Sequence, residues 1–210
     1  MIKAITVMND FDEKIRSLSG IVRGFYDRGW VQGTGGNFSV VLNQDPLRVA
    51  ITATGVDKSM VSSEQILQVD AAGIVLQGTG QTSAECGLHL AVIQALGTNA
   101  VFHTHSVWST VVSMAYAEKK GLTITGLEML KGLRGVSTHE HKEWLPIISN
   151  SQDIPFLSQE VWQLLIAAPE SHGFLVRGHG LYAWGEDLFE AKRHTEIFEF
   201  LLEVVGRTYS

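Results

Sequence analysis

The chain has 210 residues, of which 45% are hydrophobic and 18% are charged, and its formal net charge is −6. This length allows one domain of ordinary size, and so low a charged content excludes an intrinsically disordered protein. The acidic balance argues against nucleic acid and anionic membrane surfaces as partners, although a small anionic substrate needs only local hydrogen-bond donors.

The predicted elements alternate irregularly between helices and strands. In chain order, hydrophobic spacing and turn residues predict a helix at 11–26, strands at 38–42 and 47–52, a short helix at 62–67, a strand at 74–77, a helix at 82–96, a strand at 100–105 followed by a helix, a strand at 145–149, a helix at 157–168, strands at 174–177 and 181–184, and a helix at 188–205. This order predicts a single α/β domain over residues 1–210, built on a mixed, largely antiparallel sheet.

The sequence indicates neither an oxidising compartment nor a membrane. Cys86 is the single cysteine and cannot form an internal disulfide. The apolar start of the chain is short and is followed at once by acidic residues, unlike a secretory signal. The least charged long stretch, residues 101–117, contains too many histidine and hydroxyl side chains for a membrane-spanning helix. We therefore expect a cytoplasmic protein.

Two glycine-rich loops lie in the first third of the chain, at residues 33–37 and 54–59. Backbone N–H groups in such loops can converge on an anion, although ordinary tight turns explain each loop nearly as well. Neither loop has the spacing of a nucleotide-binding loop, and the sequence has no G-x-S-x-G nucleophile elbow.

The strongest chemical signal is His103-Thr104-His105, in the strand predicted at 100–105. Side chains two residues apart on a strand point to the same face, so both imidazoles can reach one cation. Zinc binds neutral imidazole and keeps an open position in catalytic sites. A solvated strand face is the alternative, but the flanking residues are apolar on both faces. A second pair, His139 and His141, lies in a polar stretch that is more typical of a solvated loop.

A third metal ligand has to come from elsewhere in the chain. His179 lies between two glycines at the turn between two predicted strands, where a backbone can approach another group closely, which suits a ligand site more than a core histidine. His89 and His194 lie on predicted helices, and a hydrogen-bonded structural histidine is the simpler interpretation of both. His172 has no distinguishing context.

Two glutamates are candidates for acid–base or metal chemistry. Glu85 ends Thr82-Ser83-Ala84-Glu85, which reads as a helix capping box; alternatively, its carboxylate lies beside the metal. Glu128 lies in the mostly apolar segment 126–132. A buried acid there would have a raised pKa suited to proton transfer, whereas exposure on an amphipathic turn is the alternative.

Together, these segments resemble the class II aldolase/adducin family. The matching segments are GTGGNFS at 33–39, TGVDKS at 54–59, SAE at 83–85, HTHS at 103–106, GHGLY at 178–182 and the closing helix from residue 187. Their order and approximate spacing hold across nearly the whole chain. The resemblance implies a three-layer α/β/α domain in a homotetramer, with one zinc ion per subunit in a site at the subunit interface.

The resemblance also implies roles for individual side chains. His103, His105 and His179 match the zinc ligands of the family, and Glu85 matches an acid that its aldolases use near zinc. The positions that match phosphate- or substrate-contacting residues are Asn37, Thr54, Gly55, Ser83 and Cys86, with Lys131 as an added positive charge. A plain buried cysteine is an equal interpretation of Cys86.

The segment Glu128-Met129-Leu130-Lys131-Gly132 distinguishes branches of this family. It resembles the E-M-x-K-G pattern of members that dehydrate a sugar phosphate, whereas sugar-phosphate aldolases often have Tyr in place of the glutamate. The resemblance therefore implies a zinc-dependent hydro-lyase for a small phosphorylated sugar-like substrate, with Glu128 as the acid/base. An aldolase or epimerase acting on a ketose 1-phosphate is the alternative. A non-catalytic adducin-like binding module is a third hypothesis, which predicts that metal ligands are missing.

Overall fold

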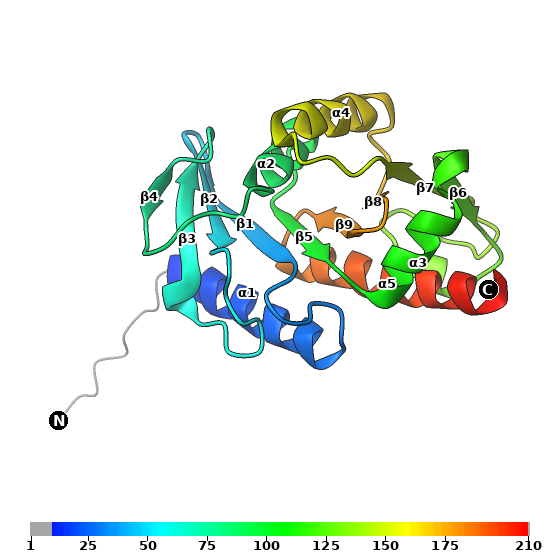
Figure 1. Ribbon diagram of the computed structural model, residues 1–210, viewed down its shortest axis with the longest axis horizontal. Coiled ribbons are helices and arrows are strands. Elements are labelled where there is room, and N and C mark those ends of the chain that lie inside the picture. Colours follow the sequence, from blue (N-terminus) through cyan, green and yellow to red (C-terminus); the bar gives the residue numbers. More distant parts are fainter. Residues whose placement is uncertain (1–9, 210) are drawn as a thin grey trace.

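The computed structural model describes residues 10–209 (Figure 1). Its α-helices are α1 (Asp10–Asp27), α2 (Cys86–Leu96), α3 (Val107–Ala115), α4 (Ile154–Ala167) and α5 (Leu188–Tyr209). Its strands are β1 (Asn37–Gln44), β2 (Leu47–Thr52), β3 (Ile66–Asp70), β4 (Val75–Gln77), β5 (Ala100–Thr104), β6 (Gly121–Ile124), β7 (Glu143–Ile148), β8 (Gly173–Val176) and β9 (Gly180–Gly185). Short 3-10 helices are η1 (Ser63–Gln65), η2 (Ala117–Lys119) and η3 (Glu128–Gly132).

The strands form one sheet in the order β4-β3-β2-β1-β5-β9-β8-β7-β6. The neighbouring pairs run antiparallel except β7 and β8, which are parallel. The prediction of a mixed, largely antiparallel sheet is therefore confirmed. Within residues 10–209, no helix is both long enough and apolar enough to cross a lipid bilayer.

Helices cover both faces of the sheet, as the three-layer prediction requires (Figure 1). Alternate residues of β5 show how the layers divide. Val101 belongs to the core cluster shared with α2 and α4, whereas Phe102 belongs to the cluster under α1. On β9, Tyr182 and Leu181 divide in the same way, with Leu181 packing in the cluster under α3 and α5. Successive side chains of each strand therefore face opposite layers, as the two-residue period of a strand requires.

The segment 62–67 is not the short helix that its spacing predicts. Only the single turn η1 forms, and β3 begins at Ile66. The reason is pairing with β2, in which Ile66 lies opposite Thr52 and Leu67 opposite Ile51. This tertiary pairing buries both side chains and outweighs local helical spacing. The short strand β6 was not predicted either.

The helix predicted to start at Thr82 begins only at Cys86. Thr82 forms an isolated antiparallel bridge with Ala53, which holds this part of the backbone extended. The backbone N–H of Glu85 then donates to Ser83 Oγ at 3.2 Å. The C-terminal end agrees with the prediction, because Gly97 caps α2 in the left-handed conformation with φ of 66°.

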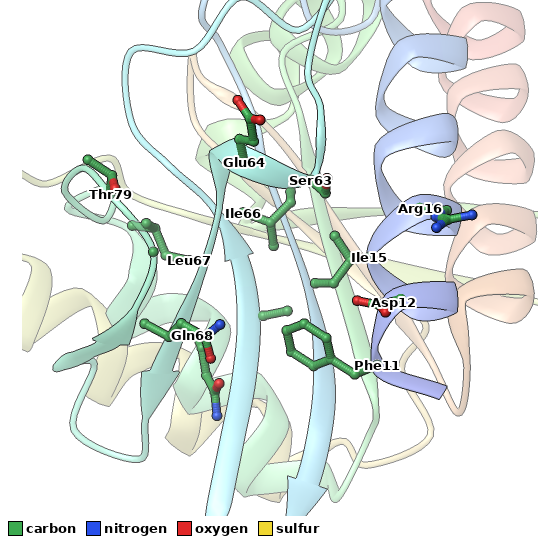
Figure 2. Close-up of a pocket in the computed structure, with 13 residues that line it drawn as sticks. Phe11, Asp12, Ile15, Arg16, Ser63, Glu64, Ile66, Leu67, Gln68 and Thr79 are labelled. Carbon is green, nitrogen blue, oxygen red and sulfur yellow. The ribbon is translucent and has the colours of Figure 1, made fainter. Parts of the chain in front are cut away.

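An open cavity of about 440 Å³ lies between the start of α1 and the strands β2 and β3. Figure 2 shows Phe11 and Ile15 of α1 on one side of it and Ile66 on the other. Among the described residues that line it, none is a predicted site residue. The candidate site therefore lies elsewhere on the sheet.

Candidate metal centre

The antiparallel pairing of β5 with β9 sets the position of three histidines. His103 lies opposite Tyr182 in this ladder, and His105 follows one residue beyond the end of β5. His179 stands in the turn just before β9. The next residue must be glycine, because a Cβ at Gly180 would overlap the Thr104 carbonyl. The expectation that glycine beside His179 permits a close backbone approach is confirmed.

Helix α3 holds the turn that carries His179. Thr110 Oγ1 lies 3.3 Å from the His179 carbonyl, and the Gly178 N–H donates to Ser113 Oγ at 3.0 Å. Gly178 has a φ of 61°, in the region that favours glycine. The turn is therefore fixed by hydrogen bonds and by backbone conformation.

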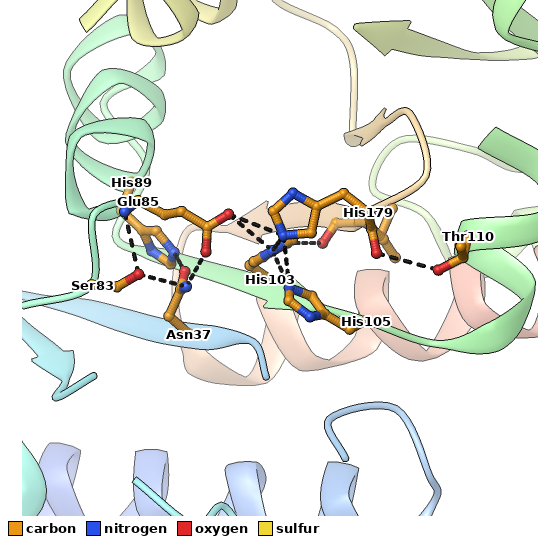
Figure 3. A network of polar contacts seen from close by, with 9 residues as sticks. Asn37, Ser83, Glu85, His89, His103, His105, Thr110 and His179 are labelled. Carbon is orange, nitrogen blue, oxygen red and sulfur yellow. Dashed lines mark hydrogen bonds and ion pairs between the residues drawn. The ribbon is translucent and has the colours of Figure 1, made fainter. Parts of the chain in front are cut away.

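The three imidazoles and one carboxylate converge on a single point (Figure 3). The Nε2 atoms of His103, His105 and His179 lie 2.7, 3.0 and 3.3 Å from one another. Glu85 Oε1 lies 3.4 Å from His103 Nε2 and 3.2 Å from His179 Nε2. All four atoms lie within 4.8 Å of one another. The structure thus brings the three histidines that the sequence predicted as metal ligands together with Glu85, for which a place beside the metal was one of two interpretations.

The protonation of the imidazoles suits metal binding. The Nδ1–H of His103 donates to the Leu181 carbonyl at 2.9 Å, which leaves the Nε2 lone pair directed at the cluster. Burial lowers the pKa of His105 to about 3, and burial also lowers the pKa of His179. Neutral imidazole is the form that binds metals, and nitrogen with carboxylate oxygen is an ordinary donor set for divalent transition metals. These residues therefore fit a divalent cation.

Glu85 is held as a carboxylate. Burial alone would raise its pKa, but His103, His179 and a hydrogen bond from Asn37 together hold the pKa well below its ordinary value. Its Oε2 accepts from Asn37 Nδ2 at 2.6 Å. The capping-box interpretation is wrong, because the side chain makes no cap hydrogen bond to the described backbone of α2 and faces the histidines instead.

Glu128 and Lys131 contact each other and not the cluster. Lys131 Nζ donates to Glu128 Oε1 at 2.6 Å, and His139 Nδ1 lies 3.8 Å from the other oxygen. The Glu128 side chain is 71% exposed, and the Lys131 hydrogen bond holds its pKa below the ordinary value. Of the two interpretations of Glu128, exposure on a turn is confirmed and a buried acid with a raised pKa is wrong, because η3 turns the side chain outward.

Several of the predicted substrate-contacting residues already form hydrogen bonds within the protein or are buried in its core. The Thr54 N–H donates to the Gln81 carbonyl at 2.9 Å, whereas Gly55 occupies a turn with φ of 70°. Ser83 Oγ accepts from the amide of Asn37 at 3.3 Å. The Cys86 side chain is buried in the core under α2, and this burial raises the pKa of its thiol to about 11.

The remaining histidines have structural partners. The His139–His141 segment lies outside the regular elements, as predicted, and His141 Nε2 lies 2.8 Å from Glu143. The same buried glutamate contacts His172 Nδ1 at 3.0 Å. His89 and His194 are buried and hydrogen-bonded, as predicted.

A buried lysine that the sequence pattern does not reveal joins the two glycine loops. Lys58 Nζ donates to the carbonyls of Thr34 and Val56, each at 3.1 Å. Burial lowers the pKa of this amine to about 8. A lysine inside a glycine turn was visible in the sequence, but its carbonyl partner on the other loop was not.

Two further buried side chains support the cluster and were not predicted. Tyr182 stacks on His103, with ring centroids 4.0 Å apart and planes at 14°. Glu199 of α5 accepts a hydrogen bond from Thr104, on the opposite face of β5. Burial raises the pKa of Glu199 to about 7. An acidic residue next to Phe198 on the buried face of an amphipathic helix was a signal that could have found it.

Comparison with known proteins identifies the class to which this fold and site belong. The chain matches the family described as Class II Aldolase and Adducin N-terminal domain over residues 16–205, and it belongs to that family. It is 40% identical over 182 residues to the methylthioribulose-1-phosphate dehydratase of Marinobacter nauticus, covering 86% of both chains. It is 44% identical over 173 residues to the dehydratase of the same name from Pseudoalteromonas translucida, covering 82% of this chain and 80% of the relative.

Among solved structures, L-fuculose-1-phosphate aldolase from Thermus thermophilus superposes with a TM-score of 0.74 at 22% identity. The match covers 94% of this chain and 98% of the aldolase. Similarity at this level of identity shows a common fold.

Replacing one histidine of the cluster tests its capacity to bind metal. His105→Ala is expected to weaken the affinity for Zn²⁺ by more than about a hundredfold, since changes to residues that merely support a ligand already cost 10–100-fold. His139→Ala, which removes an exposed imidazole, is the matched control and should leave the affinity unchanged. Affinity is measured by competition with a chromogenic chelator. Equal affinities in the two variants would contradict the proposed centre.

Glu199 makes a pH-dependent contribution to stability. Its pKa is about 7 in the folded chain against 4.5 for a free side chain, so between these values only the folded state binds the proton. The free energy of unfolding should therefore fall by roughly 2–3 kcal/mol more between pH 5 and pH 8 in the original protein than in Glu199→Gln. Equilibrium urea unfolding with chelator present, at one protein concentration, gives the free energy of unfolding of both proteins at each pH. Parallel pH profiles would show that Glu199 does not titrate in this range.

Proposed function

We propose that this chain is a hydro-lyase that converts 5-methylthioribulose 1-phosphate into 2,3-diketo-5-methylthiopentyl 1-phosphate, a step of methionine salvage. The observation that carries the proposal is the convergence of Glu85 with His103, His105 and His179 in a chain 40% identical to dehydratases of that name. We further propose that the cation is zinc, one per subunit, and that the enzyme works in the cytoplasm as a homotetramer of single-domain subunits.

The reaction removes a proton from C3 and the hydroxyl from C4 of the substrate. These two losses make one molecule of water and leave an enol across C3 and C4, which relaxes to the 2,3-diketone. The phosphate at C1 and the thioether at C5 do not react. A divalent cation held by the histidines would supply Lewis-acid chemistry next to the C2 carbonyl, which makes the C3 proton more acidic.

Glu128 is the proposed acid/base for both proton movements. Glu128 is a carboxylate at neutral pH, since the hydrogen bond from Lys131 holds its pKa below an ordinary value that is already acidic, and a carboxylate can accept the C3 proton. It then returns that proton to the departing C4 oxygen, which is a poor leaving group as hydroxide. General acid–base catalysis of this kind contributes about 10²–10⁴-fold to the rate.

The exposure of Glu128 supports a site that is shared between subunits. Within one chain its ionic partners are Lys131 and His139, so we propose that it acts at an interface. Helix α3 starts two residues after His105 and exposes an apolar stripe that a neighbouring subunit would cover. Its members, with their exposed fractions, are Val107 (69%), Val111 (39%) and Met114 (61%).

The proposed phosphate subsite lies at the two glycine loops. Lys58 joins these loops through its hydrogen bonds to the Thr34 and Val56 carbonyls, which supports a single binding surface. The Thr54 hydroxyl and the Gly55 N–H are the proposed donors to the phosphate, with Asn37 and Ser83 bordering the subsite.

Proton NMR of the zinc-loaded protein with methylthioribulose 1-phosphate tests the reaction directly. Loss of water with the carbon chain intact is the expected result. The appearance of dihydroxyacetone phosphate would show that a C–C bond was cut and would favour an aldolase. An unchanged substrate, with zinc bound, would contradict the proposed function.

The role of Glu128 is tested by Glu128→Gln. This variant should lose about 10²–10⁴-fold in turnover because the amide cannot exchange the proton, while metal content and stability stay unchanged. Glu118→Gln, at a position whose side chain is 91% exposed, is the matched control and should keep full turnover. Near-normal turnover in Glu128→Gln would remove Glu128 from the mechanism.

A further inference from the structure

A buried chain of hydrogen bonds leads from the interior of the sheet to the carboxylate of the cluster (Figure 3). Ser39 Oγ lies 2.7 Å from His89 Nδ1, and His89 Nε2 lies 2.5 Å from Asn37 Oδ1. Asn37 Nδ2 in turn lies 2.6 Å from Glu85 Oε2. Ser39 and His89 are completely buried, and Asn37 is 4% exposed. None of the chemistry proposed above explains why a histidine is buried here.

In this series of hydrogen bonds, only one assignment of donors and acceptors is consistent. A carboxylate only accepts, so the Asn37 amide must direct Nδ2 at Glu85 and Oδ1 at His89. Since Oδ1 also only accepts, His89 must carry its proton on Nε2. His89 Nδ1 is then an acceptor, and the Ser39 hydroxyl donates to it in preference to the Val101 carbonyl at 3.4 Å.

The two oxygens of Glu85 consequently have different surroundings. Oε2 is occupied by Asn37, whereas Oε1 faces His103 at 3.4 Å and His179 at 3.2 Å. The second amide hydrogen of Asn37 is directed to Ser83 Oγ at 3.3 Å, which fixes the amide plane. The carboxylate can therefore offer only one oxygen to the point where the histidines converge.

We propose that Ser39 and His89 are positioning residues that act through Asn37 to hold this carboxylate with a single oxygen facing the histidines. Asn37 thereby serves the metal centre as well as bordering the proposed phosphate subsite. Buried polar partners of this kind orient the groups that bind a metal, and losing them typically weakens metal binding by 10–100-fold. The inference concerns metal affinity, which is measured without substrate, so it can fail or hold independently of the proposed reaction.

Two substitutions of His89 separate its role in the network from its role in packing. Glutamine places an amide near the position of Nε2 and can still donate to Asn37, whereas asparagine places its amide near Nδ1 and cannot reach Asn37. His89→Asn should weaken Zn²⁺ affinity by about 10–100-fold, and His89→Gln by less than about threefold. Competition with a chromogenic chelator gives the affinities. Urea unfolding should give similar stabilities for both, and equal losses of affinity would overturn the proposal.

A double-mutant cycle tests whether the effect passes through the carboxylate. In a Glu85→Gln background, His89→Asn should weaken Zn²⁺ affinity by less than about threefold, because the group that it positions is already altered. A loss as large as in the original protein would overturn the proposal.

Ser39→Ala provides a second route if the His89 variants do not fold. It removes only the donor to Nδ1 and should weaken Zn²⁺ affinity by about tenfold, at the lower end of the range for such partners. Ser19→Ala, at another buried serine whose hydroxyl bonds within α1, is the matched control. Unchanged affinity in Ser39→Ala would overturn the proposal.

Discussion

The antiparallel pairing of β5 with β9 is the constraint on which the candidate site depends. The ladder places Tyr182 opposite His103, and the Leu181 carbonyl of β9 fixes the tautomer of that histidine. The same pairing brings the turn that carries His179 against the end of β5, and this close approach requires a residue without Cβ at Gly180. A shift of one residue in register would direct the His103 side chain to the opposite face of the sheet. Gly178, Gly180 and the Leu181 carbonyl therefore determine the geometry of the centre.

The two faces of β5 carry different titratable groups. On the α2 face, burial lowers the pKa of His105 to about 3 and also lowers that of His179, while Glu85 stays ionised. The site therefore combines neutral imidazole with one negative charge where little water reaches. Burial of such a group is costly unless a charge of opposite sign compensates it, and a divalent cation does so. On the α5 face, Glu199 accepts a hydrogen bond from Thr104, the residue between His103 and His105. The end of β5 is thus fixed on one face by the contact of His103 with Tyr182 and on the other by the hydrogen bond of Thr104 to Glu199.

Local patterns in the sequence were sufficient to predict the histidines of the site, but not the features that depend on residues distant in sequence. The two-residue period of a strand predicted that His103 and His105 share a face, and the glycines around His179 predicted a close approach. Where a role depends on distant partners, the sequence left alternatives open: a capping residue and a carboxylate beside the metal both fitted Glu85, because its histidine partners are remote in sequence. Segment 62–67 read as a helix because its pairing with β2 is equally non-local. Buried and exposed positions both fitted Glu128, because apolar neighbours surround it in sequence, and the structure shows that η3 turns it outward.

Three histidines and a carboxylate at the end of β5 should bind one divalent cation. A crystal structure of the zinc-loaded protein, with anomalous diffraction recorded at the zinc absorption edge, tests it most directly. The predicted result is one strong anomalous peak per chain, about 2.0–2.1 Å from the Nε2 atoms of His103, His105 and His179. A peak at another group of residues, or a protein that crystallises from excess zinc with no peak at this position, would contradict the claim.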